Sequence, residues 1–117
     1  MFVEDEPNLQ KAISEVLVQE GHKVFGAADG EEGLVMTKKE EPNLILLDLI
    51  LPKKDGFEVL KELKADEKLK NIPVIVLTNL EGIGDAEKAL TLGATTYLVK
   101  ANYKLEDVVN EVKEFLN

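Results

Sequence analysis

The feature that most constrains the fold of this chain is a fivefold alternation of short apolar runs with amphipathic segments. The apolar runs are expected to form strands at residues 1–3, 23–27, 44–47, 73–77 and 95–99. Each is followed by a segment with apolar side chains at helical spacing, as in the last one, which carries Leu105, Val108, Val109, Val112 and Leu116. Strands that alternate with helices predict a parallel sheet covered on both faces, so the fold class is α/β with three layers.

Local signals predict where several helices begin and end. Pro7 suits a first helical turn, with Glu6 as a cap just before it, and Gly21 is placed to end this helix. In the second helix, Val35 is expected to point inward. The fourth helix is expected at residues 86–92.

Composition and charge restrict the class of protein. A chain of 117 residues with 44% hydrophobic and 32% charged residues is typical of a single globular domain. With no cysteine, no signal-peptide pattern and no apolar run of membrane-spanning length, the sequence predicts a cytoplasmic protein that does not bind membranes. The net charge is -9 and every basic residue is a lysine, which argues against direct binding of nucleic acid.

Asp48 ends the apolar run at residues 44–47, and Pro52 follows shortly after it. A continuous apolar run predicts a strand buried on both faces of a parallel sheet. A carboxylate at the carboxyl end of such a strand would lie where open α/β sheets bind their ligands. Taken alone, a helix cap or a loop carboxylate is the more common explanation of such an aspartate.

Other polar residues follow the neighbouring strands. Glu4 and Asp5 follow the first strand, Thr78 the fourth and Lys100 the fifth. Each alone has an ordinary explanation as a cap, a turn residue or a solvated lysine. Because the carboxyl ends of parallel strands lie at one edge of a sheet, we expect all of them to converge with Asp48 in one crevice.

Such a cluster supports phosphoryl chemistry. Three carboxylates in one place need counter-charge, which Lys100 and a divalent cation would supply, and Mg²⁺ prefers oxygen ligands. A carboxylate can attack phosphorus to form an acyl phosphate, while the metal and the lysine neutralise charge on the transferring group. The hydroxyl of Thr78 could donate to a phosphoryl oxygen.

In their order and spacing, several short motifs resemble the receiver domain of two-component response regulators, the chemotaxis regulators among them. They are Val3 to Pro7, Leu47-Asp48 with Pro52 and Asp55-Gly56, Leu77-Thr78, and Tyr97 to Lys100. The resemblance runs almost end to end and implies a single receiver domain over residues 1–117. It also implies a flavodoxin-like doubly wound sheet of strand order 2-1-3-4-5 with five helices.

The resemblance assigns roles to particular residues. Asp48 would accept a phosphoryl group from a sensor histidine kinase or a phosphotransfer protein. Asp5 would be the main metal-ligating carboxylate, and Glu4 would act through metal-bound water. The backbone carbonyl of Ile50 would complete a site for Mg²⁺, for which Mn²⁺ can substitute.

The same resemblance implies a switch. Thr78 would bind the phosphoryl group, Lys100 would pair with it, and Tyr97 would turn inward when the threonine moves; a half-buried core tyrosine is the other interpretation of Tyr97. The face made by the fourth helix, fifth strand and fifth helix would contact a downstream output protein or domain. A homodimer of the phosphorylated form is a further expectation.

Two departures from the family pattern give expectations of their own. Ala101 follows Lys100 where the family has proline, and we predict a trans peptide bond there because a cis bond before a non-proline residue costs about 2.5 to 4 kcal/mol. Ile50 and Leu80 lie two residues past Asp48 and Thr78. Neither side chain can hydrogen-bond an attacking water, so we hypothesise slow self-dephosphorylation.

The sequence therefore predicts a signalling switch whose only chemistry is magnesium-dependent self-phosphorylation from a phosphodonor and slow self-dephosphorylation, rather than an enzyme with turnover. The alternative is a pseudo-receiver that acts as an interaction module without being phosphorylated, which Ala101 slightly favours. An aspartate-nucleophile phosphatase would need a second aspartate at Ile50. A flavin-binding carrier would need a phosphate loop rich in glycine and hydroxyl groups where Glu4-Asp5-Glu6 stands.

Overall fold

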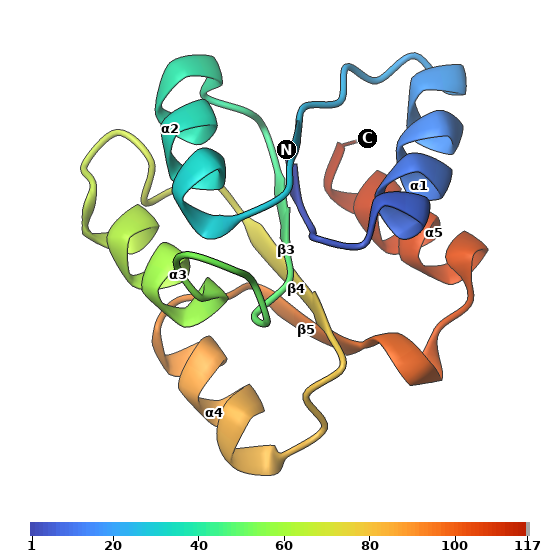
Figure 1. Cartoon of the computed structure of the whole chain (residues 1–117). Helices are drawn as coiled ribbons and strands as arrows, with labels where there is room; N and C mark the ends of the chain where they lie inside the picture. The colour runs from blue at the N-terminus through green and yellow to red at the C-terminus, as the bar shows by residue number, and fades with distance from the viewer. Residues whose placement is uncertain (117) are drawn as a thin grey trace.

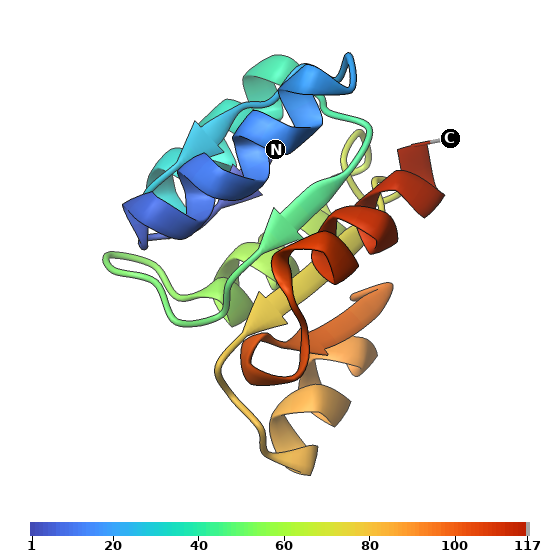
Figure 2. The ribbon, with the colours of Figure 1, turned by 90° about the vertical axis from the view of Figure 1, so that its right-hand side faces the viewer.

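The computed structural model describes residues 1–116 as one parallel sheet covered by helices on both faces (Figures 1 and 2). The strand order is β2-β1-β3-β4-β5, which confirms the predicted fold class and strand order. The strands are β1 (Phe2–Val3), β2 (Gly26–Ala27), β3 (Ile45–Leu47), β4 (Val74–Thr78) and β5 (Thr96–Val99). The helices are α1 (Pro7–Gln19), α2 (Gly30–Glu40), α3 (Gly56–Ala65), α4 (Ile83–Thr91) and α5 (Leu105–Leu116), with a short 3₁₀ turn, η1 (Lys100–Asn102).

The core is divided by the sheet into two layers. Because successive side chains of a strand point to opposite faces, Ile45 and Leu47 pack on one side while Leu46 packs on the other. The first layer lies under α2, α3 and α4, and the second under α1 and α5 (Figure 1). β3 and β4 are buried on both faces, as their apolar sequences predict.

Several local expectations need correction. Val35 was expected inward but is 66% exposed, because the buried face of α2 is set by Gly30, Gly33, Leu34 and Thr37. Glu6 occupies the N-cap position of α1, yet its side chain makes no capping hydrogen bond.

Two element boundaries also differ from the prediction by more than one residue. The strand expected at residues 23–27 pairs only over Gly26–Ala27. α4 begins at Ile83 rather than at residue 86, because its first turn buries no apolar side chain and so left no periodic signal. The expected stop at Gly21 is confirmed, since its φ of 92° lies in the left-handed region that favours glycine.

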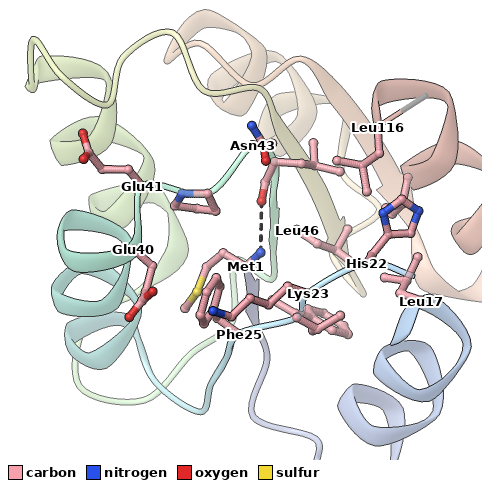
Figure 3. A pocket seen from close by; sticks show the side chains of 15 residues that line it. Met1, Leu17, His22, Lys23, Phe25, Glu40, Glu41, Asn43, Leu46 and Leu116 are labelled. Carbon is pink, nitrogen blue, oxygen red and sulfur yellow. Dashed lines mark hydrogen bonds between the residues drawn. The ribbon is translucent and has the colours of Figure 1, made fainter. Parts of the chain in front are cut away.

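A cavity of about 340 Å³ lies at the amino edge of the sheet (Figure 3). Its walls include Phe25, Leu46 and Leu116, and the Met1 amine donates to the Leu44 carbonyl at 3.1 Å. This edge is opposite to the one that holds Asp48, so the cavity contributes no residue to the cluster described below. Among the described residues, none of the helices has the length and apolar character needed to cross a membrane.

Candidate functional site

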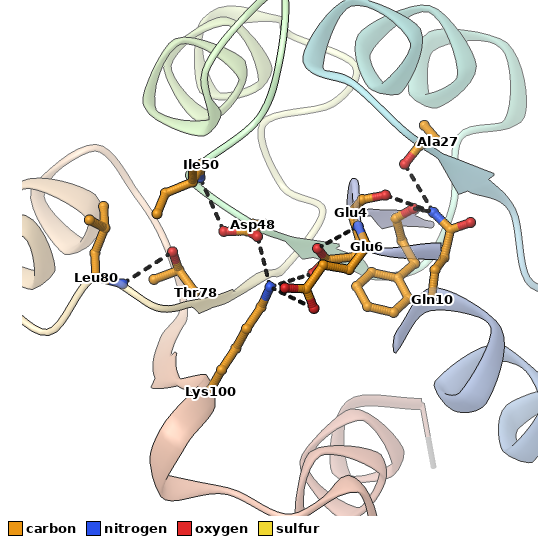
Figure 4. A network of polar contacts seen from close by, with 10 residues as sticks. Glu4, Glu6, Gln10, Ala27, Asp48, Ile50, Thr78, Leu80 and Lys100 are labelled. Carbon is orange, nitrogen blue, oxygen red and sulfur yellow. Dashed lines mark hydrogen bonds and ion pairs between the residues drawn. The ribbon is translucent and has the colours of Figure 1, made fainter. Parts of the chain in front are cut away.

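The carboxyl edge of the sheet brings Glu4, Asp48, Thr78 and Lys100 together, as the sequence predicted (Figure 4). Asp5 belongs to the same cluster, because its carboxylate lies close to those of Glu4 and Asp48. Strand pairing explains this convergence, because β1 aligns with β3 and β4 aligns with β5 at their carboxyl ends. The Asp48 N–H donates to the Val3 carbonyl at 3.0 Å, which fixes the two acidic strand ends side by side.

Asp48 is buried, with 3% of its surface exposed, and both of its carboxylate oxygens are engaged. Oδ1 accepts a hydrogen bond from the Ile50 N–H at 3.1 Å. Oδ2 accepts one from the Lys100 ammonium at 2.9 Å. The side chain is therefore held in a fixed orientation, with the Lys100 ammonium beside Oδ2.

Lys100 links Asp48 to Glu4, since its Nζ also lies 2.9 Å from Glu4 Oε1. This second contact is close enough for an ion pair but lacks the angles of a hydrogen bond, and Oε1 of the fully buried Glu4 has no hydrogen-bond partner. Glu4 Oε2 accepts from the Glu6 N–H at 3.1 Å. The buried Glu4 carboxylate is thus only partly satisfied by the protein.

The electrostatics of the cluster follow from this arrangement. Burial raises the pKa of Glu4 to about 7, and the charge of Asp48 adds to the rise while Lys100 opposes it. Burial alone would lower the pKa of Lys100, but its contacts with Glu4 and Asp48 outweigh that effect and raise it. Lys100 therefore remains an ammonium, and one positive charge serves two buried carboxyl groups.

The donor set at this edge fits a divalent cation. Glu4, Asp5 and Asp48 each offer a carboxylate oxygen, and these oxygens lie within 4.8 Å of one another. Asp5 is exposed whereas Glu4 and Asp48 are buried, so a bound ion would keep water on the open side. Hard oxygen ligands with room for water suit magnesium and similar ions. A cation here would also add positive charge beside Glu4 Oε1, whose contact with Lys100 is an ion pair without hydrogen-bond geometry.

Thr78 and Tyr97 both contact the backbone of Leu80, in the connection between β4 and α4. The Leu80 N–H donates to Thr78 Oγ1 at 3.5 Å, a long and therefore weak hydrogen bond. The Tyr97 hydroxyl donates to the Leu80 carbonyl at 2.9 Å. Burial raises the pKa of Tyr97, with smaller contributions from the charges of Asp85 and Asp48. The backbone of Leu80 thus connects Thr78 and Tyr97, the two residues to which the resemblance gives switch roles.

The Lys100–Ala101 peptide bond is trans, as predicted, and no cis bond occurs within residues 1–116. Lys100 begins the turn η1 directly after β5. Lys100 therefore reaches Asp48 even though alanine, and not proline, follows it.

Sequence reasoning missed Gln10 as a support of this edge. Its Nε2 donates to three backbone carbonyls, those of Phe2 at 3.3 Å, Glu4 at 3.3 Å and Ala27 at 3.0 Å. It therefore joins the ends of β1 and β2 to α1. The only signal in the sequence is a long amide side chain beside the apolar stripe of the first helix.

Comparison with known proteins gives a consistent result. Residues 1–113 match the family model of the response regulator receiver domain. A probable transcriptional regulator, ycf27, of Porphyridium aerugineum is 41% identical over 100 residues, which is 86% of this chain and 40% of that protein. Sporulation initiation phosphotransferase F of Bacillus subtilis is 33% identical over 116 residues, covering 99% of this chain and 91% of that protein.

Among solved structures, the Mn²⁺-bound form of response regulator Rcp1 superposes with a TM-score of 0.82 at 37% identity. The match covers 97% of this chain and 87% of Rcp1. The chain therefore spans less than half the length of the ycf27 relative but most of the length of the other two proteins.

Proposed function

Because the chain belongs to the receiver-domain family of two-component response regulators, we propose that its buried carboxylate Asp48 is the phosphoacceptor. The observation that carries this proposal is the position of Lys100, whose ammonium lies 2.9 Å from both Asp48 and Glu4 at the edge where three carboxylates converge. The immediate donor would be a phosphohistidine of a sensor kinase or phosphotransfer protein.

In the proposed reaction, an oxygen of Asp48 attacks the phosphorus of the donor. A P–O bond to Asp48 forms as the P–N bond to the donor histidine breaks, and the imidazole leaves with the electron pair and takes up a proton. Lys100 is held by Asp48 Oδ2 before the reaction, so its positive charge is already in place to stabilise negative charge that develops on the phosphoryl oxygens. Thr78, whose present hydrogen bond is long, would donate to one of those oxygens.

Receiver domains bind a divalent metal ion, and we propose that this chain uses Mg²⁺, with Mn²⁺ as a substitute. Asp5, Asp48 and the backbone carbonyl of Ile50 would ligate it directly, and Glu4 would act through water. When bound, the ion would neutralise charge on the transferring phosphoryl group. The Mn²⁺-bound state of the similar protein Rcp1 supports the choice of a hard divalent cation.

The proposal is tested by incubating the protein with Mg²⁺ and acetyl phosphate and measuring its mass. We expect one added phosphoryl group per chain, lost when Mg²⁺ is chelated and absent from Asp48→Asn. Asp107→Asn is a matched control, because Asp107 is an exposed carboxylate on α5, outside the site, that accepts a hydrogen bond from the Lys104 N–H. An unmodified wild type would support a pseudo-receiver, and release of many equivalents of phosphate would support a phosphatase instead.

We further propose that the phosphorylated state decays slowly. Ile50 is 51% exposed and Leu80 is half-buried at the two sides of the Asp48 cluster, and neither can orient a water molecule for attack. The expected lifetime is long, and Ile50→Asn should shorten it by providing an amide that can hold water. A wild-type lifetime of seconds that this substitution leaves unchanged would contradict the proposal; Val35→Asn, on the exposed side of α2, is the control.

The proposed output surface is the face of α4, β5 and α5. Exposed apolar side chains occur on α4 and at the start of α5: Ile83 is 78% exposed, Leu90 48% and Leu105 40%. Movement of Thr78 would reach this face through Leu80 and Tyr97. Its partner would be an output domain or protein, or a second phosphorylated copy. Nuclear magnetic resonance shifts that spread to α4 on beryllofluoride binding would support this surface, and shifts confined to residues near Asp48 would contradict it.

A further inference from the structure

The loop between β3 and α3 determines where the Ile50 carbonyl lies, and it is fixed at both of its ends. At the start, the Ile50 N–H donates to Asp48 Oδ1 at 3.1 Å. At the end, the Gly56 N–H donates to the Leu49 carbonyl at 2.9 Å, and a Cβ on Gly56 would overlap the backbone of Asp48. Residues 50–55, which we call the acceptor loop, therefore leave and rejoin the fold next to the proposed phosphoacceptor.

The middle of the acceptor loop rests on α2, an element that contributes no side chain to the cluster. The buried Gly30, first residue of α2, donates its N–H to the Pro52 carbonyl at 3.4 Å. The Pro52 carbonyl also accepts from the Lys54 N–H at 2.8 Å. Asp29, the N-cap of α2, lies with Oδ2 3.6 Å from the ammonium of Lys53. Pro52 and Lys53 thus contact the start of α2, and the Lys54 N–H donates to the same Pro52 carbonyl.

The contact at Gly30 leaves no room for a side chain. A Cβ at this position would overlap the carbonyl oxygen of Lys54 and lie 2.8 Å from its carbonyl carbon. These are backbone atoms, so they could give way only if the acceptor loop itself moved. The φ of Lys53 is 67°, which few non-glycine residues adopt, so the loop already holds a conformation that depends on its support.

We propose that Gly30 is a positioning residue for phosphorylation, holding the acceptor loop so that the Ile50 carbonyl faces the metal site. This inference rests on the proposed function, because it concerns the same cation and the same aspartate. A side chain at Gly30 would displace Pro52 and Lys54 and, through them, Ile50. Changes in the groups that orient metal ligands typically weaken metal affinity by about 10- to 100-fold.

The test is Mg²⁺ affinity without any phosphodonor, measured by calorimetry and by amide shifts in NMR spectra of the full chain. Gly30→Ala is compared with Gly84→Ala, because Gly84 also lies in the first turn of a helix and a Cβ there meets nothing within 4 Å. We expect Gly30→Ala to raise the half-saturating Mg²⁺ concentration about tenfold or more, with shifted amides at Ile50 and Lys54. At saturating Mg²⁺, phosphorylation by acetyl phosphate should largely recover. Gly84→Ala should match the wild type.

Folded Gly30→Ala with an unchanged half-saturating Mg²⁺ concentration would overturn the inference, as would a loss of thermal stability alone. If that variant does not fold, the wild type supplies the answer: the Gly30 amide should shift with the same half-saturation as Ile50 as Mg²⁺ is added, and an unshifted Gly30 amide would refute the coupling. A wild type that binds no Mg²⁺ and gains no phosphoryl group would instead contradict the proposed function.

Discussion

Replacing Glu4 with glutamine should stabilise the metal-free protein at pH 8. Glu4 is 1% exposed, and burial raises its pKa from 4.5 to about 7, so the ionised side chain is disfavoured in the folded state. A rise of that size corresponds to about 3 kcal/mol between the neutral and the ionised form. Glutamine resembles the neutral acid and keeps an oxygen that can accept the Glu6 N–H. The gain in free energy of unfolding should approach about 3 kcal/mol.

The raised pKa of Glu4 determines how the stability of the wild type changes with pH. Because the pKa of Glu4 is raised on folding, its contribution to stability is fully present below pH 4.5 and is lost as the pH rises to about 7. The wild type should therefore lose stability over this interval relative to Glu4→Gln, and the difference should be constant above pH 8.

The assay is urea unfolding followed by circular dichroism between pH 4.5 and 8.5, with EDTA present. Glu15→Gln, at an exposed position on α1, controls for the loss of one negative charge from a chain of net charge -9. Adding Mg²⁺ at pH 8 should stabilise the wild type more than Glu4→Gln, because only the wild type offers the third carboxylate. Equal stability of the two proteins at pH 8, or equal slopes with pH, would refute the reasoning.

Three further predictions concern packing and local geometry. Ile75→Ala, in the fully buried β4, should lower the free energy of unfolding by about 2 to 5 kcal/mol, whereas Val35→Ala on the exposed side of α2 should change it by less than about 0.5 kcal/mol in the same urea experiment. Glu41→Gly should stabilise by about 1 kcal/mol, because Glu41 ends α2 with φ 44° in the left-handed region, and a lower midpoint would contradict this. Tyr97→Phe should cost about 1 kcal/mol through the lost bond to the Leu80 carbonyl, with NMR shifts centred on residues 79–82; unchanged amides there would count against that contact.

Much of the fold was predictable because strands and helices leave strong local patterns. The continuous apolar residues of β4 and the helical spacing in α5 were sufficient to place both elements within two residues. The same patterns fail where few side chains are buried. Val35 was predicted to point inward but is exposed. The start of α4 at Ile83 was missed because the first turn of this helix buries no apolar side chain.

The sequence by itself determined which groups gather at the carboxyl edge. In a parallel α/β sheet every strand ends at the same edge, so Asp5, Asp48 and Lys100 were expected there, and the resemblance to receiver domains supplied the strand order that brings them close. Only the tertiary structure decided how they interact. It is the packing of β1 beside β3 that buries Glu4 against Lys100, raises the pKa of Glu4 and leaves one of its oxygens without a hydrogen bond. The support of the acceptor loop by Gly30 likewise depends on a contact between segments about twenty residues apart, which no local pattern encodes.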